Sequence, residues 1–406
     1  MGVPKLRFKE FSGGWQASTV GCIASSVSAG ATPSTTKREF WGGDIRWMNS
    51  GELNLKRVYE VVNRITEAGL KNSSTKILPV ESVLIGLAGQ GKTRGTVAIN
   101  YVPLCTNQSI AAIQPNPEYF VPEFLYQNLD NRYLELRGMS TGDGGRGGLN
   151  LQIIKSVPIF LPGIPEQKKI AKFLSSVDQK IAHLTKKHEL LIQYKKGVMQ
   201  KIFNQEIRFK DKNGKNFPES KRVFLGDIAQ FYKGKGISKS DISSDGLTPC
   251  IRYGELYTQY GVTISEVISK TNAPIKDLIL SKANDVIIPA SGETQIDIAT
   301  ASCVIHGGIA LGGDLNIIRT EQSGVFLCYY LNSEKKLDIA KLAQGNSVVH
   351  LYASQLKGLE IELPTLAEQE LIANFLSLID KKIALCNAEL IATKKYKQGL
   401  LQQMFI

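Results

Sequence analysis

Residues 86–93, GLAGQGKT, match the pattern G-x-x-x-x-G-K-[ST] of loops that bind nucleotide phosphates. Such a loop needs a strand that leads into it and a helix that begins at its lysine, because the free N–H groups of the helix then point at the phosphates. The apolar residues 83–85 predict the strand. The sequence RGTVAI after Thr93 predicts a turn and a second strand instead of a helix. An ATPase that uses residues 86–93 is therefore one hypothesis, to be decided by the elements around the loop.

Other patterns of catalytic or metal-binding residues are absent from the sequence. Its four histidines form no H-E-x-x-H motif, and no G-x-S-x-G motif occurs. The six cysteines include no C-x-x-C pair, so we expect free thiols in a reducing cytoplasm, without disulfides or a zinc site. We also expect no membrane span and no export, because the chain has no run of 18 apolar residues and no apolar signal-peptide core.

Composition and charge predict a globular protein with an anionic partner. The 406 residues, 43% hydrophobic and 21% charged, suit two to four domains. The net charge is +12, and it is unevenly divided: residues 1–203 hold 26 Lys and Arg against 15 Asp and Glu, and residues 204–406 hold 23 against 22. A basic excess favours a polyanion such as nucleic acid, although an ordinary solvated surface explains it equally well.

The chain contains an internal duplication. The sequence LPGIPEQKKIAKFLSSVDQKIAHL begins at Leu161, and LPTLAEQELIANFLSLIDKKIALC begins at Leu363, an offset of 202 residues. Shorter landmarks return at nearly the same offset, including Gly51-Glu52-Leu53 as Gly254-Glu255-Leu256. We therefore expect two tandem copies, with a first mixed domain at 1–160, a helix at 161–204, a second mixed domain at 205–362 and a final helix at 363–406.

The matched end of each copy has the heptad spacing of a long helix. Steps of four and three residues connect apolar positions; His188 and Lys195 interrupt the first series, and Thr393 and Lys397 interrupt the second. Pro165 and a capping box, Thr365-x-x-Glu368, mark the helix starts. Because the apolar stripes must be buried, we expect the helices to pair as an antiparallel coiled coil; two separate oligomerisation coils are the alternative. The expected pairing residues are Ile170, Leu174, Val177, Ile181, Leu184, Ile372, Leu376, Ile379 and Ile383.

The first part of each copy predicts a mixed α/β (α+β) domain. Short apolar strands are expected at 83–85, 97–99, 286–288 and 315–318, separated by polar loops rich in glycine. Loops of this kind, carried on a scaffold, commonly bind ligands. Residues 138–150, GMSTGDGGRGGLN, are the most glycine-rich example and include Arg146.

Residue types in these loops favour DNA recognition over nucleotide hydrolysis. Arginine pairs with guanine and glutamine with adenine in the major groove, while Lys92 and Thr93 suit phosphate. The corresponding segment of the second copy, residues 291–295, lacks the Lys-Thr pair. A nucleotide site should keep its chemistry, whereas a base-reading loop should change to read another sequence. The candidates in the first copy are Trp47, Asn49, Ser50, Gln90, Lys92, Thr93, Arg94 and Arg146. Those in the second are Lys233, Lys235, Lys239, Arg252, Tyr253, Glu293, Gln295, Asn346, His350 and Tyr352.

The repeated pattern L-P-x-x-x-E-Q-x-x-I-A-x-F-L-x-x-x-D-x-K-I resembles the helices of the specificity subunits of bacterial type I restriction–modification enzymes. Thr32-Pro33-Ser34, followed by Phe40-Trp41-x-Gly43-Asp44-Ile45-x-Trp47, is similar to the opening of many target recognition domains of that family. The resemblance adds Thr32 and Ser34 to the DNA-binding candidates. It covers the whole chain, more loosely in the second domain.

The resemblance implies a non-catalytic, cytoplasmic subunit. Each target recognition domain would bind half of a bipartite double-stranded DNA site, and the helix pair would set the gap and dock two modification (methyltransferase) subunits. S-adenosylmethionine would belong to those partners, and ATP and Mg²⁺ to restriction/translocase subunits. An assembly protein whose coils join other chains without DNA contact remains a further alternative beside the ATPase.

Overall fold

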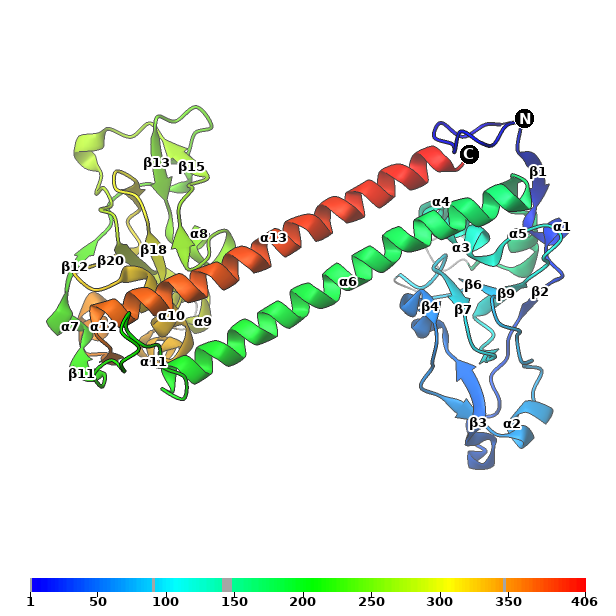
Figure 1. Ribbon diagram of the computed structural model, residues 1–406, viewed down its shortest axis with the longest axis horizontal. Coiled ribbons are helices and arrows are strands. Elements are labelled where there is room, and N and C mark those ends of the chain that lie inside the picture. Colours follow the sequence, from blue (N-terminus) through cyan, green and yellow to red (C-terminus); the bar gives the residue numbers. More distant parts are fainter. Residues whose placement is uncertain (1, 90–91, 141–147, 346–347) are drawn as a thin grey trace. The chain divides into compact units, whose positions relative to one another are not determined.

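The structure, a computed structural model, describes residues 2–89, 92–140, 148–345 and 348–406. It divides into two compact units (Figure 1). Unit 1 comprises Met1–Lys186 and Asn387–Ile406, and unit 2 comprises Lys187–Cys386. Each unit therefore contains one globular part together with a segment from each of two long helices.

A five-stranded sheet forms the centre of unit 1, in the order β2-β9-β6-β7-β4. Its strands are β2 (Ser26–Ala29), β9 (Ile110–Gln114), β6 (Val83–Gly86), β7 (Val97–Asn100) and β4 (Arg57–Val58). Neighbours are antiparallel except for β4 and β7. Every residue of β6 and β7 is buried, which explains why both strands appear in the sequence as uninterrupted apolar runs. The strands expected at 83–85 and 97–99 are confirmed.

A second, three-stranded sheet of unit 1 has the order β5-β3-β8 and lies on the side of the five-stranded sheet away from the long helix (Figure 1). Its strands are β3 (Trp41–Met48), β5 (Arg64–Ile65) and β8 (Cys105–Thr106). β1 (Gln16–Thr19) pairs with β10 (Pro158–Leu161) at the root of the long helix. The helical elements are α1 (Val20–Ile23), η1 (Arg38–Phe40), η2 (Ser50–Leu55), α2 (Glu67–Lys71), α3 (Pro122–Asn131), α4 (Tyr133–Gly138) and α5 (Leu151–Ser156).

Unit 2 repeats this topology. Its five-stranded sheet has the order β12-β20-β16-β18-β14, and its three-stranded sheet has the order β15-β13-β19. The strands are β12 (Ala229–Lys233), β20 (Leu315–Thr320), β16 (Asp285–Pro289), β18 (Ser302–Val304), β14 (Thr263–Ile264), β15 (Ser269–Thr271), β13 (Thr248–Ile251) and β19 (Ala310–Leu311). The parallel pairs β14–β18 and β13–β19 match β4–β7 and β3–β8 of unit 1. The strands expected at 286–288 and 315–318 are confirmed as parts of β16 and β20.

The remaining elements of unit 2 surround these sheets. β11 (Lys221–Phe224) pairs with β22 (Glu360–Leu363), and β17 (Ser291–Gly292) pairs with β21 (Val349–His350). The helical elements are α7 (Leu225–Ile228), η4 (Lys239–Asp241), α8 (Tyr253–Thr258), η5 (Ile275–Asp277), α9 (Gln295–Ile298), α10 (Gly324–Ser333), α11 (Lys336–Leu342) and α12 (Ala353–Lys357).

The two long helices are α6 (Ile164–Phe203) and α13 (Leu366–Met404). In unit 1, Ile170 and Leu174 of α6 share a buried cluster with Leu400 and Met404 of α13. In unit 2, Ile202 of α6 belongs to a cluster that also contains residues from the first turns of α13, namely Ile372, Ala373, Leu376 and Ile379. Because the start of each helix packs with the end of the other, the helices run antiparallel.

The expected pairing residues differ in burial. Ile170, Leu174, Leu184, Ile372, Leu376 and Ile379 are buried, whereas Val177, Ile181 and Ile383 are half-buried. The buried pairing residues near each helix start also pack against the globular part of their unit. The apolar stripe of each helix therefore contacts both the other long helix and the globular part.

The repeated Glu-Gln pair fastens each helix start to its globular part. Glu166 accepts two hydrogen bonds from Arg7, from Nε and Nη2, both at 2.7 Å. Glu368 accepts the same pair from Arg208, at 3.2 and 2.8 Å. The capping box expected at Thr365 is wrong: the Thr365 hydroxyl is buried without a hydrogen-bond partner, and the Glu368 carboxylate accepts from Arg208 instead of from the backbone.

Three features of the described residues bear on the expected chemistry. No helix among them is long and apolar enough to cross a membrane. They contain no group of three or more His, Cys, Asp or Glu side chains that could hold a metal ion. None of the six cysteines forms a disulfide, and burial raises the pKa of Cys105 and of Cys250 to about 11 in each case.

Candidate nucleic-acid interface

The loop after β6 does not have the geometry of a nucleotide-binding loop. A turn at 92–95 leads directly into β7, and no helix begins at Lys92. Gly95 N donates to Gly86 O at 2.9 Å, and Thr96 N donates to Thr93 O at 3.0 Å. These bonds close a hairpin between two antiparallel strands, so residues 92–95 provide no helix N-terminus to point at a phosphate.

The candidate residues of this hairpin differ in their exposure to solvent. Lys92 is exposed, while its carbonyl is held by the hydroxyls of Thr96 and Tyr133 at 2.6 and 3.2 Å. Thr93 is half-buried, and Arg94 is only 8% exposed. The Lys92 side chain is therefore accessible to a ligand, whereas that of Arg94 is largely covered. Gln90 and Arg146 lie outside the described residues.

Two tryptophans hold the segment that carries Thr32 and Ser34. Trp47 Nε1 donates to Ala31 O at 3.0 Å, and Trp41 Nε1 donates to Ser34 O at 3.1 Å. The two indole rings meet edge to face, with 5.0 Å between centroids. Thr32 and Ser34 are exposed, whereas Trp47 is 6% exposed. Trp47 therefore acts in the packing that positions its neighbours.

Asn49 and Ser50 lie where β3 ends and η2 begins. Asn49 Oδ1 accepts from Gly51 N at 2.8 Å, and its Nδ2 donates to Glu52 Oε2 at 2.9 Å. Both residues are half-buried. The Asn49 amide is thus partly engaged in fixing the backbone turn that follows the strand.

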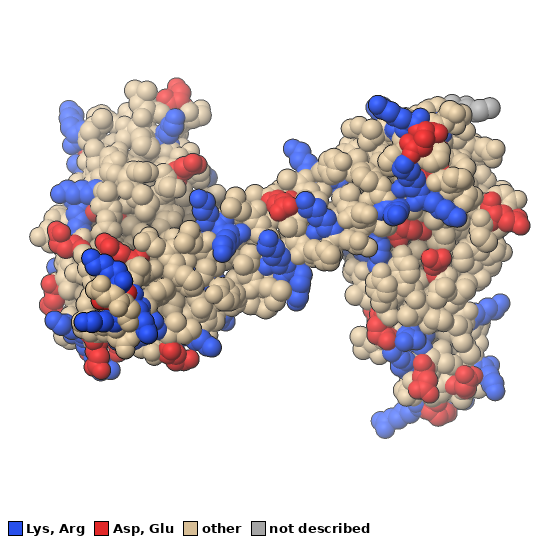
Figure 2. Space-filling model, in the orientation of Figure 1, with Lys and Arg blue, Asp and Glu red and all other residues tan. Residues whose placement is uncertain are grey.

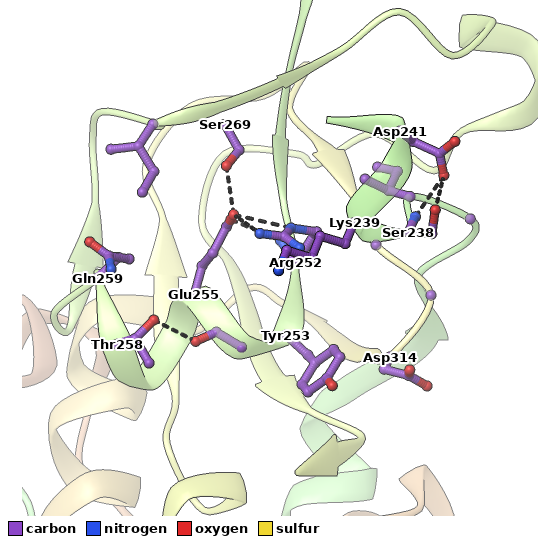
Figure 3. A pocket seen from close by; sticks show the side chains of 16 residues that line it. Ser238, Lys239, Asp241, Arg252, Tyr253, Glu255, Thr258, Gln259, Ser269 and Asp314 are labelled. Atoms are coloured by element: carbon purple, nitrogen blue, oxygen red, sulfur yellow. Dashed lines mark hydrogen bonds and ion pairs between the residues drawn. The ribbon is translucent and has the colours of Figure 1, made fainter. Parts of the chain in front are cut away.

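The second unit brings three candidates together in one depression of about 900 Å³, which Lys239, Arg252 and Tyr253 line (Figure 3). Glu255 lies beneath Arg252 and is 6% exposed. The repeated Gly-Glu-Leu landmark contains this carboxylate, but it was not among the expected site residues. Its donors are Arg252, three residues before it, and Ser269 on β15.

A second group of candidates lies along the β17–β21 pair. Ser291 is paired with His350 in this sheet, so the segment with Glu293 and Gln295 runs close to His350 and Tyr352. All four of these candidate side chains are exposed, and the rings of His350 and Tyr352 stack with 6.3 Å between centroids. Asn346 lies outside the described residues.

Lys233 and Lys235 form a third group at the end of β12, next to Gly236, which lines the depression. Both are exposed, and Lys235 N donates to Leu311 O at 3.0 Å. Figure 2 shows basic side chains spread over the visible face among acidic ones, without one dominant basic patch. Charge therefore supports a polyanionic ligand but does not locate its site.

Comparisons with known proteins agree with the fold. A sequence model of the type I restriction modification DNA specificity domain matches the chain twice, at residues 12–193 and 218–394. The type I restriction enzyme MjaIX specificity subunit of Methanocaldococcus jannaschii is 26% identical over 402 residues, covering 93% of this chain and 90% of the relative. The EcoR124I/EcoR124II specificity subunit of Escherichia coli is 30% identical over 177 residues, 43% of each chain.

Solved structures show the same architecture. The S subunit of the type I restriction–modification system from M. genitalium superposes with a TM-score of 0.64 at 15% identity, covering 100% of this chain and 99% of that one. The HsdS subunit from Thermoanaerobacter tengcongensis gives 0.50 at 16% identity, covering 97% and 96%. These similarities confirm the fold expected from the sequence: two mixed domains and two long helices.

Proposed function

The chain belongs to the family of type I restriction–modification DNA specificity domains, and on this premise we propose how its two units read DNA. Each globular part contacts one half of a bipartite double-stranded site, and the antiparallel helices set the number of unread base pairs between the halves. The chain is a recognition subunit and not an enzyme.

The observation that carries this proposal is the repeated topology with changed loops. Both units have the same strand order in both sheets, yet the side chains at equivalent loop positions differ. Asn49 in unit 1 is replaced by Arg252 in unit 2, and the Lys-Thr of residues 92–93 has no counterpart at 291–295. A shared scaffold with different side chains in its loops suits the recognition of two half-sites that differ in sequence.

The exposed and half-buried candidates divide into two kinds of contact. Lys92, Lys233, Lys235 and Lys239 supply positive charge for backbone phosphates, which position a protein on DNA. The polar side chains supply contacts to base edges: Thr32, Ser34, Asn49, Ser50, Thr93, Arg252, Tyr253, Glu293, Gln295, His350 and Tyr352. Gln90, Arg94, Arg146 and Asn346 complete the proposed set.

The long helices also offer surfaces for partner subunits. In unit 1, Phe173, Val177, Ala392 and Tyr396 line a mainly apolar groove of about 400 Å³ between α6 and α13. We assign such surfaces to two modification (methyltransferase) subunits, with restriction/translocase subunits completing the complex. S-adenosylmethionine, ATP and Mg²⁺ then belong to those partners, and the complex works in the cytoplasm, where its DNA is.

Footprinting of the assembled complex tests the proposal. The full chain with its modification subunits should protect two patches of a duplex, separated by base pairs whose identity can be varied without loss of binding. One continuous patch would contradict a bipartite site. Absence of any salt-dependent DNA binding would favour an assembly protein that does not contact DNA.

A further inference from the structure

We infer that Arg252 reads a guanine in the half-site of unit 2 and that Glu255 is the positioning residue that aims it. This inference rests on the proposed function. It adds which base is recognised, which side chain recognises it and which residue holds that side chain in place. It comes from the hydrogen bonds in the depression beside α8 (Figure 3).

Glu255 holds Arg252 from one side only. The carboxylate accepts the Arg252 backbone N–H at 3.1 Å through Oε2, and it accepts Nε and Nη2 at 3.2 and 3.1 Å through Oε1. Ser269 Oγ donates to the same Oε1 at 2.6 Å. The Glu255 side chain is 7% exposed and that of Arg252 is 29% exposed, so the support is buried and the supported group reaches the surface.

The free edge of the guanidinium has the geometry that guanine requires. Within the described part of the chain, Nη1 of Arg252 has no hydrogen-bond partner, and Nη2 uses one of its two N–H groups on Glu255. Nη1 and Nη2 together form the end-on fork that donates to guanine O6 and N7. A carboxylate along the other edge fixes the plane of this fork and reduces the entropy lost on binding.

The depression leaves room for a base edge to approach. Gly312 and Gly313 line it beside Arg252. A Cβ atom added at Gly312 would lie 3.5 Å from Arg252 Cα and 3.8 Å from its Cγ. A larger side chain at this glycine would therefore fill space next to the arginine stem. Lys239, also at the depression, supplies charge for a neighbouring phosphate.

Unit 1 contains the same support with a different side chain. Glu52 accepts the Asn49 backbone N–H at 3.0 Å, as Glu255 accepts that of Arg252 at 3.1 Å. Both acceptors stand three residues after the residue they hold, in the repeated Gly-Glu-Leu. The glutamate is therefore the constant part of this arrangement, and the supported residue is the part that changes between the two half-sites.

The test uses the full chain with its methyltransferase subunits and DNA duplexes in which every position of both half-sites is varied singly. For the wild type, one guanine in one half-site should be required. Arg252→Ala and Arg252→Lys should each lower the preference for that guanine by roughly 5- to 150-fold, the value of one bidentate contact, and leave the other half-site unchanged. Lysine keeps the positive charge but lacks the two parallel N–H donors. A loss of guanine preference in Arg252→Lys therefore identifies bidentate recognition.

Glu255→Gln should weaken the preference at the same base pair, whereas Glu255→Asp, which keeps the charge, should restore part of it. Arg222→Ala is the matched control, because this arginine is 72% exposed, pairs with Glu362 and does not line the depression. Thermal unfolding of each variant shows that the fold is retained.

Three results would overturn the inference: no change at any guanine, an equal loss at all positions, or full activity of Arg252→Lys. If the wild-type complex recognises no bipartite site at all, the proposed function itself fails, and the inference fails with it.

Discussion

Lys397 Nζ of α13 lies 2.6 Å from Asp178 Oδ1 of α6, and both side chains are 15% exposed. The pair recurs in unit 2, where Lys195 Nζ of α6 lies 2.5 Å from Asp380 Oδ1 of α13. The two lysines are among the residues that interrupt the heptad series, and each is paired with the aspartate of the other helix. A lysine in an apolar seam needs a partner, and in this register each of the two lysines has an aspartate of the other helix within reach. The interruptions therefore fix how the helices align.

The first prediction concerns the stability of this alignment. Lys397→Met removes the partner of a buried carboxylate, and we expect it to lower the free energy of unfolding by roughly 1–3 kcal/mol, less than for an isolated pair because Arg57 still contacts Asp178. Lys180→Met is the matched control, since Lys180 and Glu389 form an exposed pair between the same helices, and a change of about 0.5 kcal/mol or less is expected. Urea unfolding measures both, and equal effects would contradict the role given to Lys397.

The second prediction concerns pH. Burial raises the pKa of Asp178, but hydrogen bonds and charges from Lys397, Gln127 and Arg57 outweigh burial and leave the pKa below its ordinary value. A lowered carboxyl pKa means that the stabilisation is complete at neutral pH and is lost as pH falls below about 4. Asp178→Asn should therefore be less stable than the wild type at pH 7, with a smaller difference at pH 3. Urea midpoints at the two pH values check this, and a constant difference would be inconsistent with it.

The third prediction concerns the helix start in unit 1. Gln167 is 1% exposed; its Oε1 accepts from Val121 N at 2.8 Å, and its Nε2 donates to the carbonyls of Tyr119 and Pro162 at 3.0 and 2.8 Å. Gln167→Ala leaves these backbone groups unpaired and should cost roughly 2–4 kcal/mol. Hydrogen exchange should increase around residues 119–121 and remain unchanged in unit 2. Gln179→Ala, at an exposed position of the same helix, should alter neither, and a uniform effect on both units would argue against a local role.

The fourth prediction separates phosphate contact from base reading at the 92–95 turn. Lys92→Ala should weaken DNA binding by a similar factor for all sequences and reduce the slope of log K against log salt by about 1. Lys92→Arg keeps the charge and should retain both the affinity and the slope. Binding titrations at several salt concentrations measure these quantities; a loss confined to one sequence would make Lys92 a base reader.

Local patterns in the sequence predicted much of the scaffold. Heptad spacing located both long helices, and buried apolar runs located β6, β7, β16 and β20, because these signals depend on neighbouring residues. The Thr365 capping box was predicted wrongly, since Glu368 is engaged by Arg208, 160 residues away. The small sheets around β3 and β13 depend on pairings between distant short segments, which periodicity does not reveal.

The candidate site was less accessible from the sequence. Residue type suggested Arg252. Its pairing with Glu255, three residues later, is local and was not used, whereas the hydrogen bond from Ser269 to Glu255 appears only when β15 pairs with β13. Trp47 illustrates the opposite case. Its type and position favoured DNA contact, whereas the structure shows a buried indole that holds the backbone of Ala31.

A map of adenine methylation in the host genome, made with and without the gene for this chain, tests the central claim most directly. We predict that one methylated motif disappears with the gene, and that it consists of two different specified halves separated by a constant number of unspecified base pairs. A single uninterrupted motif, or a set of motifs unchanged by the loss of the gene, would contradict two readers held in register by one helix pair.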